Sequence, residues 1–77
     1  MATNAKTKTA TDPLAQFGAR VKALRAECGL SQEALAHESN LARSYVGEVE
    51  TGKRNISLLN IHKLAKALGC GPSDLLR

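Results

Sequence analysis

Three cationic side chains gather in the second half of the chain, and their types suit contact with a polyanion. Arg43 opens a short predicted helix, and Lys53–Arg54 form a basic pair in the loop just past it. A guanidinium group can donate two parallel hydrogen bonds to O6 and N7 of a guanine, and both kinds of cation neutralise phosphate. The formal net charge of +4 points the same way, although many small soluble domains are basic and these side chains could be solvated surface charges. Nucleic acid is therefore the partner class that the charges favour.

The sequence does not indicate metal binding, catalysis or membrane insertion. Cys28 and Cys70 have no CxxC spacing, and the two histidines stand alone, so no metal site is predicted. We interpret the cysteines as small side chains that fill the core in a reducing compartment. No nucleophile–base pair or paired carboxylate stands out, so we expect neither catalysis nor a cofactor or small-molecule ligand. No apolar run approaches the roughly 20 residues of a membrane span, and the first residues lack the apolar stretch of a signal peptide, which predicts a cytoplasmic protein without membrane contact.

The elements that position the cations are predicted to be helices throughout. Residues 1–11 are rich in Thr and Ala and are predicted to be a disordered tail, with a basic arm that grips DNA as the alternative. Residues 12–77 are predicted to form one all-α domain of five short helices. Asp12, Ser31 and Ser57 are N-caps of the first, second and fourth helices, and Asn40 suits a left-handed turn. Gly71–Pro72 opens a final single turn.

Apolar residues at three- and four-residue steps predict which helix faces are buried. The predicted core residues are Leu14, Phe17, Val21, Leu24, Cys28, Leu35, Ala36, Val46, Val49, Leu58, Ile61, Leu64, Ala65 and Leu68. Leu59 lies off the stripe of its helix, close to Leu75 and Leu76 at the end of the chain. Exposed apolar groups that cluster usually mark an interface, although Leu59 could be an isolated surface leucine.

Two short helices joined by a turn of three to four residues, with the small Ala36 at their crossing, are typical of a helix-turn-helix. This motif projects the beginning of its second helix into the major groove of B-DNA. Here that beginning is Arg43–Ser44, with Glu48 a turn later. A helical hairpin with an ordinary surface arginine fits the spacing equally well.

The run from Leu30 to Lys53, LSQEALAHESNLARSYVGEVETGK, also resembles the helix-turn-helix of the phage repressor and Cro-type (XRE) family, without a gap. Gln32, Leu35–Ala36, the segment 50–53 and Arg25 fall at family positions. Within the family, the stretch SNLARSYV and the following GKRNIS are most similar to the controller proteins of restriction–modification systems. The resemblance covers residues 14–77 and implies a compact, five-helix, lambda-repressor-like DNA-binding domain.

The resemblance also implies roles for individual residues. The implied DNA-contacting residues are Gln32, Arg43, Ser44, Tyr45, Glu48, Lys53, Arg54 and Asn55. Arg43 and Ser44 would meet base edges, with Glu48 joining them. Tyr45 would contact phosphate or a flexible pyrimidine–purine step, and Gln32 would hold the DNA backbone. Lys53, Arg54 and Asn55 would hold phosphates or reach a base at the groove edge. Arg25 would pair with Glu50 at the end of the recognition helix. Ala42 departs from the pattern, because the family usually has a capping Ser, Thr or Asp there.

These observations predict a transcriptional regulator that binds a pseudo-palindromic operator in double-stranded DNA as a homodimer and regulates its own gene in the manner of a controller. The predicted dimer interface is Leu59, Leu75 and Leu76. We expect the protein in the cytoplasm, associated with the nucleoid through its DNA. Two alternatives remain: an antitoxin of the same fold that also binds a toxin protein, and a protein-interaction module of this fold that does not bind DNA.

Overall fold

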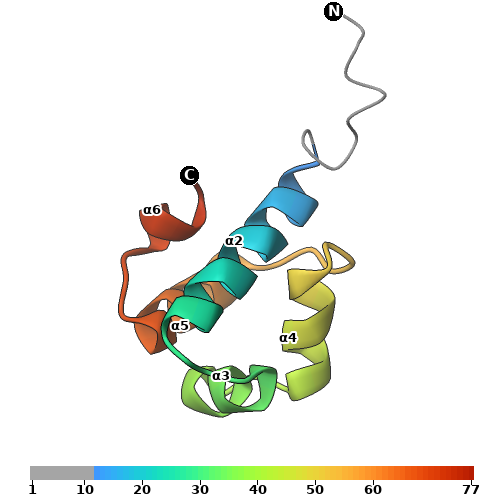
Figure 1. The fold of residues 1–77 in the computed structure, drawn as a ribbon. Coiled ribbons are helices and arrows are strands. Elements are labelled where there is room, and N and C mark those ends of the chain that lie inside the picture. The colour runs from blue at the N-terminus through green and yellow to red at the C-terminus, as the bar shows by residue number, and fades with distance from the viewer. Residues whose placement is uncertain (1–11) are drawn as a thin grey trace, which may run out of the picture.

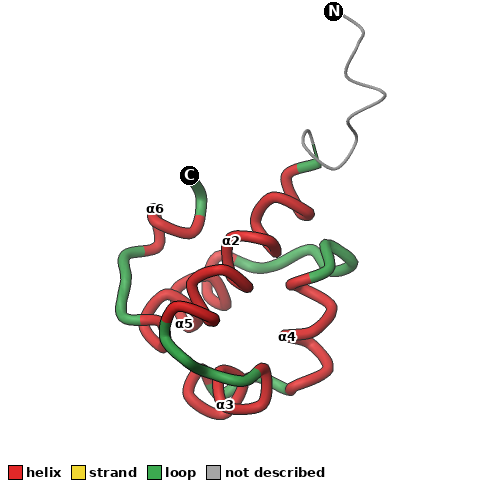
Figure 2. Tube along the Cα trace, in the orientation of Figure 1, coloured by secondary structure: helices red, strands yellow, loops and turns green. Residues whose placement is uncertain are grey.

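Residues 12–77 are the part of the chain that the structure, a computed structural model, describes, and they form helices and no strands (Figures 1 and 2). The helices are α2 (Pro13–Glu27), α3 (Gln32–Ser39), α4 (Arg43–Glu50), α5 (Leu58–Leu68) and α6 (Pro72–Leu75). The predicted five-helix, all-α architecture is thus confirmed for these residues. The predicted tail of residues 1–11 lies outside the described residues.

The helix ends follow the capping chemistry of the sequence. The side chains of Asp12, Ser31 and Ser57 accept hydrogen bonds from backbone N–H groups two or three residues later, at 3.0, 3.0 and 3.1 Å. Asn40 ends α3 in the left-handed conformation, with φ 59° and ψ 43°. Ala42 precedes α4 and supplies no side-chain cap. The backbone N–H groups at the start of α4 therefore lack the N-cap side-chain oxygen that satisfies one of them at the starts of α2, α3 and α5.

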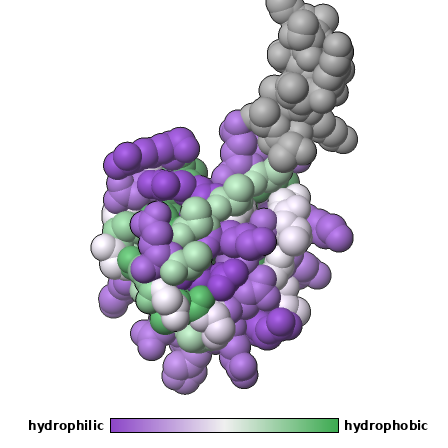
Figure 3. Space-filling model, in the orientation of Figure 1, coloured by the Kyte–Doolittle hydropathy of each residue, from purple (hydrophilic) through white to green (hydrophobic). Residues whose placement is uncertain are grey.

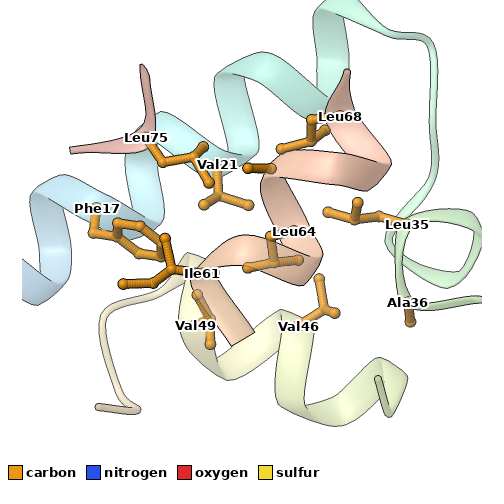
Figure 4. Packing of buried hydrophobic residues seen from close by; sticks show 11 residues of the cluster. Phe17, Val21, Leu35, Ala36, Val46, Val49, Ile61, Leu64, Leu68 and Leu75 are labelled. Carbon is orange, nitrogen blue, oxygen red and sulfur yellow. The ribbon is translucent and has the colours of Figure 1, made fainter. Parts of the chain in front are cut away.

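One apolar core lies between all five helices, with Leu64 of α5 near its centre (Figure 4). Its members are Phe17, Val21, Leu35, Ala36, Val46, Val49, Ile61, Leu64, Ala65, Leu68 and Leu75. Four predicted core residues are not among these buried members. The side chain of Leu58 is 70% exposed, and Cys28 is exposed as well, so both predictions were wrong. Leu14 and Leu24 are only partly buried.

A glycine contact sets the distance between α2 and α4. A Cβ atom built on Gly18 would lie 2.2 Å from the carbonyl oxygen of Val49 and 2.7 Å from that of Glu50. A real Cβ atom does not come this close to a backbone oxygen, so only glycine lets the two backbones touch here. The sequence pattern predicts a close crossing only at Ala36, which is indeed buried, with 4% of its surface exposed.

The arrangement leaves α4 on one side of the molecule. In Figure 1, α2 runs diagonally across the front with α5 behind it, α3 lies at the lower end, and α4 lies on the right, packed on α2 and α3. The last residues return to the beginning of α2, where Leu76 and Arg77 line a small hollow with Pro13 and Gln16. No helix within residues 12–77 has the length and apolar character needed to cross a membrane.

Candidate nucleic-acid interface

The pair α3–α4 forms a helix-turn-helix with a three-residue turn, residues 40–42. The N–H of Leu41 donates to the carbonyl oxygen of Ala36 at 2.9 Å, which closes the end of α3. Val46 of α4 packs into the core and has no exposed surface. These contacts fix the angle between the two helices and direct the first turn of α4 outward.

A buried ionic cluster fixes the other end of α4. The carboxylate of Glu50, with a side chain only 1% exposed, accepts hydrogen bonds from Arg25 Nε at 2.6 Å and Arg25 Nη2 at 3.1 Å. Arg25 Nη1 also donates to the carbonyl oxygen of Leu30 at 2.8 Å. The hydrogen bond to Glu50 is the main cause that raises the pKa of Arg25, against the opposing effect of burial. The implied pair is confirmed, and it ties α4 to α2.

Gln32 is the third member of this cluster. Its Nε2 donates to Oε1 of Glu50 at 2.9 Å, and its amide lies over Gly47 of α4. The side chain expected to hold the DNA backbone is thus engaged inside the protein, although Gln32 still opens α3. Sequence spacing carried no signal for this contact. Among the described residues, no buried side-chain nitrogen or oxygen is left without a hydrogen-bond partner.

The first turn of α4 presents the residues expected to meet base edges. Arg43 and Ser44 are both exposed, next to the uncapped helix start at Ala42. Hydrophilic side chains project on the side of the molecule where α4 lies (Figure 3). Backbone N–H groups at such a helix start attract anions, so the geometry suits a polyanion as well as donor contacts to bases.

Three of the expected contact residues touch each other on the outer face of α4 and the following loop. Arg54 Nε donates to Oε1 of Glu48 at 3.0 Å, and the guanidinium lies 5.2 Å from the centroid of the Tyr45 ring. The hydroxyl oxygen of Tyr45 accepts a hydrogen bond from Nδ2 of Asn60 in α5 at 3.0 Å. The acidic Glu48 is therefore partly neutralised by its neighbour. Asn60 was missed by the sequence analysis, because nothing in its helix pattern marks it.

Lys53 and Asn55 lie in the same loop and are exposed. The N–H of Lys53 donates to the carbonyl oxygen of Glu48 at 2.9 Å, so the loop begins directly at the end of α4. Of the eight expected DNA-contacting residues, seven thus lie on α4 and the loop after it. Gln32 alone has its side chain turned toward Glu50.

The three leucines expected at a dimer interface do not share one environment. Leu59 and Leu76 are 65% and 62% exposed, whereas Leu75 is 1% exposed and completes the core. One terminal leucine closing the core and the other facing outward is the arrangement that the sequence analysis predicted for this pair. Leu75 therefore offers no surface to a partner, and Leu58, which was assigned to the core, is exposed instead.

Comparison with known proteins agrees with this geometry. Residues 21–75 match the helix-turn-helix family HTH_3. The control protein C.BamHI of Bacillus amyloliquefaciens is 49% identical over 61 residues, which span 78% of this chain and 75% of that protein. The control protein C.MunI of a Mycoplasma species is 44% identical over 61 residues, 78% of this chain and 82% of the relative. The crystal structure of the restriction–modification controller protein C.AhdI from Aeromonas hydrophila superimposes with a TM-score of 0.80 at 58% identity, covering 80% of this chain and 94% of that one.

The fold and the exposed start of α4 define a helix-turn-helix domain of the repressor type. The chain belongs to the HTH_3 helix-turn-helix family and is a DNA-binding transcriptional regulator.

Proposed function

We propose that the protein reads an operator in duplex DNA with one continuous surface, which we call the reading surface. It consists of Arg43, Ser44, Tyr45, Glu48, Lys53, Arg54 and Asn55. The observation that carries the proposal is the contrast between the two ends of α4: its last residue, Glu50, is locked to α2 and α3, while its first turn is exposed. A rigid helix that offers its first turn to solvent is the geometry that enters a major groove.

Within this surface the residues divide by chemistry. Arg43 is positioned to pair with the O6 and N7 atoms of a guanine, and Ser44 to donate to or accept from either kind of base. Lys53 and Asn55 flank the groove and hold phosphates, which supplies most of the affinity but no sequence information. Gln32 supports this surface from within the protein, because the hydrogen bond from its amide to Glu50 keeps the start of α3 close to α4.

In the proposed complex, Arg54 can bind either the carboxylate of Glu48 or a DNA phosphate. In the free protein it pairs with Glu48, and both side chains are about half exposed, so the pair contributes little to stability. A phosphate can replace the carboxylate at no great cost. Arg54→Ala is therefore expected to weaken binding to all sequences alike and to reduce the salt dependence by about one unit of slope.

Selection of bound fragments from random duplex DNA, followed by titration at several salt concentrations, tests the proposal. We expect one enriched sequence and an affinity that falls steeply with salt for both matched and unmatched duplexes. Absence of salt-dependent binding to any duplex would instead identify a protein-interaction module with this fold.

We further propose that the functional unit is a homodimer. One domain of this size covers few base pairs, and the repressor-type solution is two copies about 34–36 Å apart on half-sites one helical turn apart. Leu58 and Leu59 begin α5, directly after the loop that carries Lys53 and Arg54, and are the most exposed large apolar side chains of the described residues, followed by Leu76. A symmetric contact through Leu58, Leu59 and Leu76, the leucine surface, would bury them and bring the basic loops of two copies toward the operator centre.

Sedimentation of variants tests the dimer. Leu59→Asp and Leu76→Asp are expected to keep the helical content, halve the measured mass and abolish cooperative occupancy of a two-fold operator. Ala23→Asp, at an exposed position of α2, is the control and should leave the mass unchanged. A wild-type protein that stays monomeric at high concentration and binds one copy per site would contradict the dimer.

The biological role that we propose is that of a controller acting in the cytoplasm on chromosomal or plasmid DNA, including its own promoter. Support comes from the two control proteins and the controller structure to which the chain is similar. A reporter fused to the upstream region of the gene should respond to added protein and lose that response with Arg43→Ala. A reporter whose output does not change when the wild-type protein is added would contradict autoregulation, but it would not contradict DNA binding.

A further inference from the structure

The only two cysteines of the chain lie at neighbouring helix ends although 42 positions separate them. Cys28 caps the end of α2, and Cys70 follows the end of α5. The Sγ atom of Cys28 lies 3.6 Å from the carbonyl oxygen of Leu68, two residues before Cys70. Both thiols are free. The contact places the Cys28 thiol against the end of α5, directly before the turn that carries Cys70; a disulfide would require the two Cα atoms to lie within about 7 Å of each other.

The two turns also have room to adjust. Gly29 follows Cys28 and Gly69 precedes Cys70, with φ of 72° and 71°, and a Cβ at either glycine would meet nothing within 4 Å. Each turn is held on its far side, by Arg25 at the carbonyl oxygen of Leu30 and by Asp74 at the N–H of Gly71. A bond between the two sulfur atoms would therefore form mainly through rotation of the cysteine side chains, with the glycines taking up the remaining change.

The thiols differ in accessibility. Cys28 is exposed, whereas Cys70 is partly buried. Burial, followed by the charge of Asp74, raises the pKa of the Cys70 thiol; Arg20 opposes this shift, and the neighbouring Cys28 adds to it. Solvent-borne reagents therefore meet Cys28 first, and the raised pKa of Cys70 leaves a smaller fraction of that thiol as the reactive thiolate.

We propose that Cys28 and Cys70 are a site of reversible thiol oxidation that forms an intramolecular disulfide with a low-molecular-weight disulfide as oxidant. The Cys28 thiolate attacks one sulfur of the oxidant and releases one small thiol, leaving a mixed disulfide on Cys28. The thiolate of Cys70 then attacks the Cys28 sulfur and releases the second small thiol. The two protein thiols are oxidised, losing two protons and two electrons, and the oxidant is reduced to two thiols.

The bond would enclose the whole segment from α3 to α5 and join the end of α2 to the turn before α6. In Figure 1 this junction lies on the left of the molecule and α4 on the right, so the reading surface is not part of it. The cross-link would act by restricting the unfolded chain, which stabilises more the longer the enclosed loop. Oxidation would thus stabilise the domain, and this effect does not depend on DNA binding.

Equilibration of the full chain with mixtures of reduced and oxidised glutathione, with acid quenching, tests the proposal. We expect the intact mass to lose two hydrogen atoms, a peptide map to join the Cys28 and Cys70 peptides, the protein to run as a monomer without reductant, and the melting temperature to rise by about 5 °C or more. Dithiothreitol should restore the starting mass and melting temperature. Cys28→Ser and Cys70→Ser are matched controls that should show neither the mass loss nor the higher melting temperature.

Three outcomes would overturn the proposal. The first is a disulfide between two chains in place of the internal one. The second is a glutathione adduct that persists on Cys28 of the wild-type protein while Cys70 stays free. The third is an internal disulfide that leaves the melting temperature unchanged or lowers it, because the bond would then strain the native geometry rather than fit it.

Discussion

Replacement of Glu50 by alanine is expected to be among the most damaging single substitutions in the chain. The Glu50 side chain is 1% exposed, and its carboxylate accepts two hydrogen bonds from Arg25 and one from Gln32. Without it, the Arg25 guanidinium, 15% exposed, keeps only the carbonyl of Leu30 as a partner. Stranding a mostly buried charge costs about 3–5 kcal/mol. A chain of this length has a free energy of unfolding of only about 4–12 kcal/mol, so Glu50→Ala removes a large share of it.

Urea denaturation measures the effect as a change in midpoint at constant slope. Glu27→Ala and Glu38→Ala are the controls, since both side chains are exposed and should change the free energy by less than about 0.5 kcal/mol. Arg25→Met combined with Glu50→Leu should recover much of the loss, because an apolar pair leaves no charge behind. Equal midpoints for Glu50→Ala and the two controls would show that the ionic cluster does not hold α4.

Three further substitutions test separate contacts. Gly18→Ala should lower the free energy of unfolding by about 1–3 kcal/mol in urea denaturation, because its Cβ would lie 2.2 Å from a carbonyl oxygen of α4. Gly47→Ala is its control and should be neutral or stabilising, since its Cβ would meet only a side chain at 3.7 Å. Ala42→Ser should raise the melting temperature by supplying the missing cap, worth about 0.5–2 kcal/mol, and an unchanged melting temperature would mean that the helix start is satisfied in another way. Glu48→Gln should tighten binding to unmatched duplexes in low-salt titrations, because it removes a negative charge and frees Arg54, with a stability change within about 1 kcal/mol.

Local signals predicted the helices well. Asp12, Ser31 and Ser57 mark helix starts because their side chains satisfy backbone N–H groups within three residues, a chemistry that depends on nothing distant. Asn40 marks the turn for a similar reason, since its left-handed conformation is a local preference. The helix-turn-helix followed from these ends and from the resemblance between residues 30 and 53.

The errors came from contacts between elements. Leu58 shares a helical stripe with Ile61, but periodicity does not say how far the covering helices extend, and the first residue of α5 is left uncovered. The close contact at Gly18 could not be predicted, because a glycine is required there only by the backbone of α4, which lies far away in the sequence. The DNA contact of Gln32 stays a prediction; its hydrogen bond to Glu50 was not predicted, because it depends on how α3 packs against α4.

Whether the exposed first turn of α4 reads bases is decided by the specificity ratio of Arg43→Ala. The affinity of the wild-type protein and of this variant would be measured for the selected operator and for a duplex altered at one base pair per half-site, at the same salt concentration. We expect the variant to lose about 1–3 kcal/mol on the operator and its preference at one position per half-site, with binding to unrelated DNA much less affected. A variant that binds both duplexes more weakly by the same factor, with its preference intact, would show that Arg43 contacts only phosphate and that the bases are read elsewhere.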